Sequence, residues 1–231
     1  MLELRPFDRL GRFDGGWLDA RYHFSFADYL DHQRMGVGKL RVWNDDTIQP
    51  GTGFPPHGHR DMEIVTYVRE GAVTHQDSLG NVGRTEAGQV QVMSAGTGIR
   101  HSEANTDGEV LRLFQIWILP DRAGRPPRWE TRPFPRLHGQ LEVLASGRDE
   151  DVAAGVPRIW QDARVLAGTL DAGDRVICPL LHRHAYLVPA KGGITVNGVA
   201  VPERSGLLVA DETELDIRAA EHAEVVVVDV A

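Results

Sequence analysis

The sequence is built from short segments in which polar and apolar residues alternate, each closed by a turn signal. Alternation with a period of two is typical of a strand that has one buried face. With 25 Gly and 13 Pro among its 231 residues, the chain also leaves little room for long helices. We therefore expect an all-β protein. The expected strands are residues 39–43, ending at the turn-like Asn44-Asp45-Asp46, and residues 63–69, 72–77, 89–93, 111–119, 159–165, 185–188 and 223–228, with a hairpin over residues 193–201 that turns at Asn197-Gly198.

A stretch rich in Arg and Pro, residues 121–135, divides the chain into two halves with similar strand patterns. Proline lacks the amide that a central strand needs, so we expect this stretch to be an exposed connector. The sequence thus predicts two domains, residues 1–132 and 133–231. The one helix that we expect covers residues 26–32, with Ser25 as its cap.

The composition disfavours several classes of protein. Lys and Arg number 25 and Asp and Glu number 33, which gives a net charge of −8 and disfavours direct nucleic-acid binding. No segment approaches the roughly 18 apolar residues of a membrane-spanning helix. The first residues carry an acid and a proline where a secretory signal would be basic and then apolar, so we expect a cytoplasmic protein.

Cys178 is the single cysteine, which excludes an intrachain disulfide, and we expect it to be a packing residue.

Two pairs of residues have the spacing and the chemistry of metal ligands. His57 and His59 lie two residues apart, so an extended strand would turn both imidazoles to one face. His101 and Glu103 repeat this spacing further along the chain. Three imidazoles and one carboxylate suit a first-row divalent ion that keeps open positions for other ligands. Glu63 falls on the same strand face as His59 by parity, so at this point it is an equally good carboxylate.

The segments around these pairs resemble a known family. Residues 51–63, with a Gly followed by His-x-His and a Glu, look like the first motif of the cupins. Residues 88–105 look like the second cupin motif in the form used by pirins, and residues 17–29 resemble the pirin amino-terminal signature. The resemblance implies a bicupin, which has two antiparallel β-barrels of the jelly-roll type in one chain and one metal ion in the amino-terminal barrel.

The resemblance also implies which residues bind the metal. In pirins the ligands are the two histidines of the first pair and the histidine and glutamate of the second. Glu63 then remains as a group that could support the ligands. Gly58 stands where many pirins have a proline between the two histidines, which leaves the ligand types intact. The implied ligands are His57, His59, His101 and Glu103.

The function that the resemblance implies is metal-dependent oxidation. Bacterial pirin-like proteins are similar to quercetin 2,3-dioxygenases, which open the central ring of a flavonol with O2, so a flavonol and O2 are the expected partners. Glu103 could loosen from the metal and accept the 3-hydroxyl proton as a general base. Fe is the metal expected first, with Ni, Mn, Cu, Co and Zn as alternatives.

A non-catalytic, redox-responsive interaction protein is the alternative function, and a barrel acting on an unrelated small molecule is a third. A bicupin already pairs two barrels, so we expect a monomer.

Two further expectations concern the surroundings of this site. His182 and His184 form another pair, but no His-x-Glu partner follows, so we expect no metal site in the second half. A flavonol needs an apolar pocket beside the metal. The candidate walls of that pocket are Trp43, Phe54, Met93 and Ile116, although for each of them separately a place in the core is the favoured interpretation, because an apolar residue on a barrel strand is more often a core residue.

Overall fold

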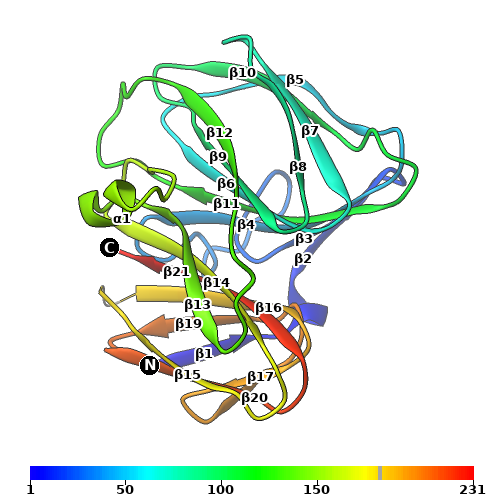
Figure 1. The fold of residues 1–231 in the computed structure, drawn as a ribbon. Coiled ribbons are helices and arrows are strands. Elements are labelled where there is room, and N and C mark those ends of the chain that lie inside the picture. Colours follow the sequence, from blue (N-terminus) through cyan, green and yellow to red (C-terminus); the bar gives the residue numbers. More distant parts are fainter. Residues whose placement is uncertain (182–183) are drawn as a thin grey trace.

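The structure is a computed structural model that describes residues 1–181 and 184–231. These residues form four antiparallel sheets and very little helix, as the sequence predicts. The first half of the chain lies above the second half in Figure 1. In the described part of the chain, no helix is long and apolar enough to cross a membrane.

In the first half, a seven-stranded sheet lies opposite a four-stranded sheet. The larger sheet has the order β12-β9-β6-β11-β4-β3-β2, and the smaller has the order β5-β10-β7-β8. The strands are β2 (Gly11–Asp14), β3 (Leu18–Tyr22), β4 (Leu40–Ile48), β5 (Gly53–His59), β6 (Glu63–Glu70), β7 (Ala72–Asp77), β8 (Val82–Glu86), β9 (Gln89–Ser94), β10 (Ile99–Ala104), β11 (Leu111–Ile118) and β12 (Arg128–Pro133).

The second half repeats this arrangement with a six-stranded and a four-stranded sheet, in the orders β1-β19-β16-β21-β14-β13 and β15-β20-β17-β18. β1 comes from the start of the chain, so the first strand belongs to the sheet of the other half. The remaining elements are a 3-10 helix (Phe7–Arg9) and a short helix α1 (Asp149–Ala153). The strands are β1 (Leu2–Arg5), β13 (Gln140–Ser146), β14 (Ala163–Leu170), β15 (Arg175–Pro179), β16 (His184–Lys191), β17 (Ile194–Val196), β18 (Val199–Val201), β19 (Gly206–Ala210), β20 (Glu214–Ala219) and β21 (Ala223–Val230).

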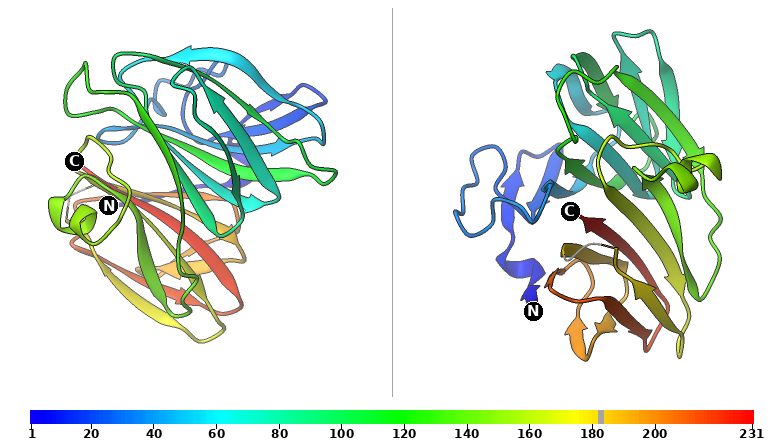
Figure 2. Two further views of the ribbon diagram at one scale, coloured as in Figure 1. Left: turned by 45° about the horizontal axis from the view of Figure 1, so that its top comes forward. Right: turned by 90° about the vertical axis from the view of Figure 1, so that its left-hand side faces the viewer.

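The two larger sheets share one hydrophobic core, which joins the halves. Trp43 on β4 and Phe114 on β11 belong to the same buried cluster as Tyr186 on β16. The Trp43 ring lies 5.5 Å from Phe114 and 5.6 Å from Tyr186, measured between ring centroids. Figure 2 shows the larger sheets of the two halves facing each other. Each larger sheet is therefore buried on both faces, one against the other half and one against its own smaller sheet.

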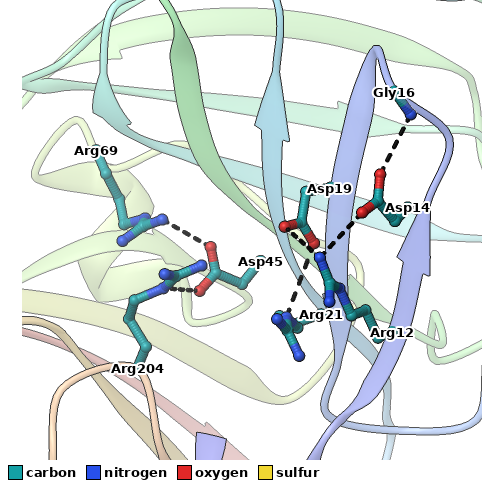
Figure 3. A network of polar contacts seen from close by, with 8 residues as sticks. All are labelled: Arg12, Asp14, Gly16, Asp19, Arg21, Asp45, Arg69 and Arg204. Atoms are coloured by element: carbon teal, nitrogen blue, oxygen red, sulfur yellow. Dashed lines mark hydrogen bonds and ion pairs between the residues drawn. The ribbon is translucent and has the colours of Figure 1, made fainter. Parts of the chain in front are cut away.

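A buried ion-pair network also crosses this interface (Figure 3). Asp45 on β4 has a fully buried side chain and accepts hydrogen bonds from Arg69 at 2.7 Å and from Arg204 of the second half at 2.6 Å. The same figure shows Arg12 bonded to Asp14 on the exposed β2–β3 hairpin. Two cations around one buried carboxylate compensate its desolvation, so this network fixes how the halves meet.

The structure corrects the expected end of the strand over 39–43. β4 does not stop at Asn44-Asp45-Asp46 but continues to Ile48. The polar residues stay in the strand because each has a buried place: Asp45 enters the ion-pair network, and Asn44 and Asp46 face the interior of the first half. A run of Asn and Asp indicates a turn only where those side chains are exposed to solvent.

The expected helix over 26–32 is also wrong. Phe26 and Tyr29 exchange two backbone hydrogen bonds across a tight turn, and Ala27 has a positive φ of 50°. Ser25 does not cap a helix. Its hydroxyl donates a hydrogen bond to the carbonyl oxygen of Asp31 and accepts one from the backbone N–H of Asp31, which closes this loop. The rings of Phe26 and Tyr29 pack against the core of the first half, so tertiary contacts decide the local conformation.

Two other boundaries differ from expectation. The strand expected over 159–165 begins at Ala163, as β14. The connector over 121–135 contains β12, which pairs with β9 at the edge of the seven-stranded sheet. An edge strand tolerates the proline at its end, because one side of its backbone makes no ladder bonds. The domain limits at residue 132, the monomer and the cytoplasmic location stay predictions.

Candidate metal centre

Three of the predicted ligands meet on neighbouring strands. β5 and β10 pair with His57 directly opposite His101, so both side chains lie on one face. The Nε2 atoms of these two residues are 3.1 Å apart. The ring centroid of His59 lies 4.7 Å from that of His57 and 4.9 Å from that of His101. One nitrogen from each residue lies within 4.8 Å of the other two, which is near enough for the three imidazoles to bind one ion.

Glu103 lies two residues beyond His101 on β10, past an irregularity in the pairing with β5. Its side chain is buried, and its carboxylate accepts hydrogen bonds from two amides. Gln91 Nε2 donates to Oε1 at 2.6 Å, and Gln115 Nε2 donates to Oε2. A carboxylate oxygen of Glu103 lies within 4.8 Å of a nitrogen of His101. The two amides therefore orient the carboxylate beside the histidines.

Burial keeps His59 and His101 neutral. Burial, followed by the neighbouring His101 and His57, lowers the pKa of His59 to about 4. Burial, followed by His57 and His75, lowers the pKa of His101 to about 3. Only a neutral imidazole has a lone pair free for a cation, so at neutral pH these donors can bind a metal without first losing a proton.

Sequence reasoning missed His75, which lies behind His101. The two Nδ1 atoms are 3.4 Å apart, and His75 Nε2 lies 3.0 Å from an oxygen of Asp77. The His75 ring stacks on Trp129 of β12 at 4.8 Å and 9°. Gly83 makes room for this stack, because a Cβ there would lie 2.2 Å from the Trp129 ring. The sequence signal was the strand 72–77, in which His75 and Asp77 share a face by parity.

Each contact from His101 through His75 to Asp77 can have one donor and one acceptor. If His101 donates its Nδ1 proton to His75, its Nε2 keeps a lone pair directed at His57 and the ligand group. His75 then carries its own proton on Nε2 and donates it to the Asp77 carboxylate. The side chains of both His75 and Asp77 are fully buried. This chain of hydrogen bonds selects the tautomer of His101 that a metal requires.

A cavity of about 350 Å³ opens beside the histidines, between the two sheets of the first half. Its walls are largely aromatic and apolar, and the Trp117 ring lies 4.9 Å from that of His59. Its polar groups come from the strands beneath it. A concave site with apolar walls and a few polar groups is typical of small-molecule binding. The lining residues are Leu18, Tyr22, Phe26, Asn44, Asp46, Phe54, Pro55, His57, His59, Glu103, Gln115 and Trp117.

Among the candidate walls, only Phe54 lines the cavity, and the other three are core residues. Trp43 and Ile116 point from the opposite face of the same sheet into the core between the halves. Met93 packs in a small separate cluster. Alternation along a strand shows that its two faces differ, but it does not show which of two buried faces borders a cavity.

Glu63 does not support the ligands as expected. Its buried carboxylate accepts a hydrogen bond from Ser94 Oγ at 2.6 Å and lies near the backbone of Trp160 in the second half. Burial raises its pKa. The parity argument failed because β5 ends at His59, and a turn at Asp61, with φ 48°, starts a new strand in the other sheet. Glu63 joins the two halves instead.

Two expectations concern the second half. Cys178 is buried in its core, and burial raises the pKa of the thiol to about 11, which agrees with a packing role. Of the expected ligand-free pair, His182 lies outside the described residues, and His184 begins β16. Within the described residues, the groups of potential metal ligands all belong to the first half.

Family models match both halves of the chain. The model named Pirin matches residues 4–118, and the model of the quercetinase C-terminal cupin domain matches residues 143–230. Full-length relatives share more than half of the sequence: a pirin-like protein of Caulobacter vibrioides is 55% identical over 100% of both chains. The chain belongs to the pirin family. The two halves are therefore two cupin domains, as the resemblance implied.

Other pirin relatives connect the fold with an activity and with a metal. A protein of Escherichia coli K12 named quercetin 2,3-dioxygenase is 42% identical, covering 99% of this chain and 98% of its own. The crystal structure of the bacterial pirin YhhW from Escherichia coli in complex with nickel(II) superposes with a TM-score of 0.93 at 41% identity, covering 100% of this chain and 99% of that one.

Proposed function

We propose that one divalent transition-metal ion binds in the first cupin domain. Four side chains would hold it, and they offer three imidazoles and one carboxylate. This donor set suits a first-row ion and leaves coordination positions open for a substrate. The nickel(II) complex of a pirin relative that is 41% identical supports the proposal. The proposed ligands are His57, His59, His101 and Glu103.

The proposed activity is a metal-dependent flavonol dioxygenase of the quercetin 2,3-dioxygenase type. The observation that carries it is the convergence of three imidazoles at the edge of an apolar cavity of about 350 Å³. A flavonol is a flat aromatic molecule with an enol and a carbonyl on adjacent carbons. Its rings suit the aromatic walls, and its chelating oxygens suit the open positions of a metal. The name of the 42% identical relative supports the same chemistry.

When bound, a divalent ion lowers the pKa of the flavonol 3-hydroxyl and holds the resulting anion. The remaining work belongs to the side chains. Glu103 accepts the 3-hydroxyl proton on one of its carboxylate oxygens. Gln91 and Gln115 keep that carboxylate oriented by their amide hydrogen bonds. Phe54 and Trp117 bury the rings and exclude water from the reacting carbons.

An oxygen-electrode assay tests the activity. Protein loaded with each of Fe, Ni, Mn, Co, Cu and Zn in turn should consume O2 as it depletes quercetin, and metal-free protein should not. The variant Glu103→Gln removes the proton acceptor at constant size and should slow turnover. Absence of quercetin-dependent O2 consumption with every metal would overturn the enzymatic proposal. Metal and flavonol binding without turnover would then favour the interaction protein.

A further inference from the structure

A row of polar side chains crosses the floor of the cavity. In register, Gln91 of β9 lies opposite Thr66 of β6, Thr66 opposite Gln115 of β11, Gln115 opposite Asn44 of β4, and Asn44 opposite Tyr22 of β3. Alternation sends all five side chains to the same face of the sheet. This face is the one that the smaller sheet and its histidines cover.

The two ends of this row differ in whether their side chains bond to Glu103. At the β9 end, Gln91 donates to Thr66 and to Glu103, and Gln115 donates to Glu103 and accepts from Trp117. The amide nitrogens there are committed to Glu103, although Gln91 Oε1, in a residue that does not line the cavity, has no partner among the described residues. At the β4 end, the polar side chains lie near these hydrogen bonds but take no part in them.

At the β4 end, two oxygens are buried without a hydrogen-bond partner among the described residues. They are Oδ1 of Asn44 and Oδ1 of Asp46, which lies two residues further along the same face. Asn44 is 5% exposed and Asp46 is 3% exposed, and both residues line the cavity. Burying an acceptor without a donor is unfavourable, and most buried polar groups in proteins have partners. Other buried polar atoms of the described residues also lack a partner, but these two acceptors lie on the wall of one cavity, where a ligand can supply the donors.

The local electrostatics agree with this interpretation. Burial, followed by the charges of Asp45 and Glu103, raises the pKa of Asp46 well above its ordinary value. The other carboxylate of this strand, Asp45, has two arginine partners on the opposite face of the sheet. Asp46 makes no such ion pair among the described residues, and the charge of Arg69 offsets its burial only in part, so burying Asp46 lowers the stability of the fold. A destabilising carboxyl group that is kept on the floor of a cavity indicates a role in binding rather than in folding.

We propose that Asn44 and Asp46 form a receptor for hydroxyl groups of an aromatic ligand whose chelating end faces the histidines. The proposal rests on the proposed function and adds to it the class of substrate. The cavity then selects flavonols that carry hydroxyls on the rings besides the 3-hydroxyl. Phe54 and the other apolar walls contact any flat ring system alike, so they do not contribute to this choice.

Equilibrium binding without O2 tests the receptor separately from turnover. Ni(II)-loaded protein is titrated anaerobically with quercetin, which has four further hydroxyls, and with 3-hydroxyflavone, which has none. The wild type should bind quercetin at least about tenfold more tightly, because each satisfied buried acceptor favours the hydroxylated ligand. The variants Asn44→Leu and Asp46→Leu should each reduce this preference, and the double variant should abolish it while changing the Kd of 3-hydroxyflavone less than about threefold.

Two controls show whether a change belongs to the receptor. Thr47→Val alters the opposite face of β4 at nearly constant shape and should leave both Kd values unchanged. Asp46→Asn keeps an acceptor oxygen and should restore part of the preference. The metal-free leucine variants should melt at the same temperature as the wild type or higher, because they remove buried oxygens that have no partner.

The outcomes separate the two proposals. Equal weakening of both ligands in the leucine variants, or no weakening of either, would overturn the receptor even if the protein turns over quercetin. A lost preference in a protein that never consumes O2 would support the receptor and overturn the dioxygenase. If the wild type binds neither flavonol, both proposals fail.

Discussion

The contact between His75 and His101 leads to a sharp prediction about metal affinity. His75→Phe keeps an aromatic ring that can stack on Trp129 but removes the nitrogen that accepts the Nδ1 proton of His101. His101 then loses the partner that selects its metal-binding tautomer, and a buried N–H is left without an acceptor. Loss of such supporting hydrogen bonds typically weakens metal binding by 10- to 100-fold, which corresponds to about 1.4 to 2.8 kcal/mol.

Competition with a chromophoric chelator, with Ni(II) as the probe metal, measures this change directly. His138→Phe is the matched control, since His138 is an exposed histidine of the second half. A Co(II)-loaded sample gives a second measurement: the shifted, exchangeable Nδ1 proton of His101 should be visible by NMR in the wild type and lost by exchange in His75→Phe. Comparison of the metal-free melting temperatures separates an effect on metal binding from an effect on folding.

Two results would refute this reasoning. An affinity of His75→Phe within about twofold of the wild type would mean that the hydrogen-bonded chain does not influence the ligand. A drop in the number of imidazoles around the metal, measured by X-ray absorption, would mean that His75 is itself a ligand. The second result is a real alternative, because His75, His101 and Glu103 also form a group with ligand atoms within 4.8 Å of one another.

Three further predictions concern stability, pH and catalysis. Asp45→Ala leaves two arginines unpaired between the halves and should lower the free energy of unfolding by about 3 kcal/mol in urea titrations; an unchanged midpoint would contradict this. Burial and nearby arginines lower the pKa of His23 to about 3, so the unfolded chain binds a proton below about pH 6.5 that the folded protein excludes. From pH 7 to pH 5 this residue should cost about 2 kcal/mol of stability, a loss that His23→Phe should not show. Glu103→Gln should lower the turnover of quercetin by about 100-fold or more, and an equal rate would exclude it as the base.

The sequence predicts the proposed ligands because their spacing is local. In the pairs His57 and His59, and His101 and Glu103, a period of two places both side chains on one face of a strand, and the resemblance to pirins joins the two pairs. The partners of these residues are less accessible. Gln91 and Gln115 contact Glu103 only because β9, β10 and β11 are brought together by the fold. Trp129 reaches His75 from a segment that the prolines indicate to be a connector.

The errors in the cavity walls come from the double burial of the seven-stranded sheet, and they suggest a better rule for such sheets. When a strand is buried on both faces, apolar residues mark the core face and tell little about the cavity. In β4 the apolar Trp43 faces the other half, whereas the polar Asn44 and Asp46 face the cavity. In β11 the same contrast separates Ile116 from Gln115. A polar residue inside an otherwise apolar strand is expensive to bury, so where no ion pair accounts for it, as the two arginines do for Asp45, it is the stronger sequence signal for a binding site.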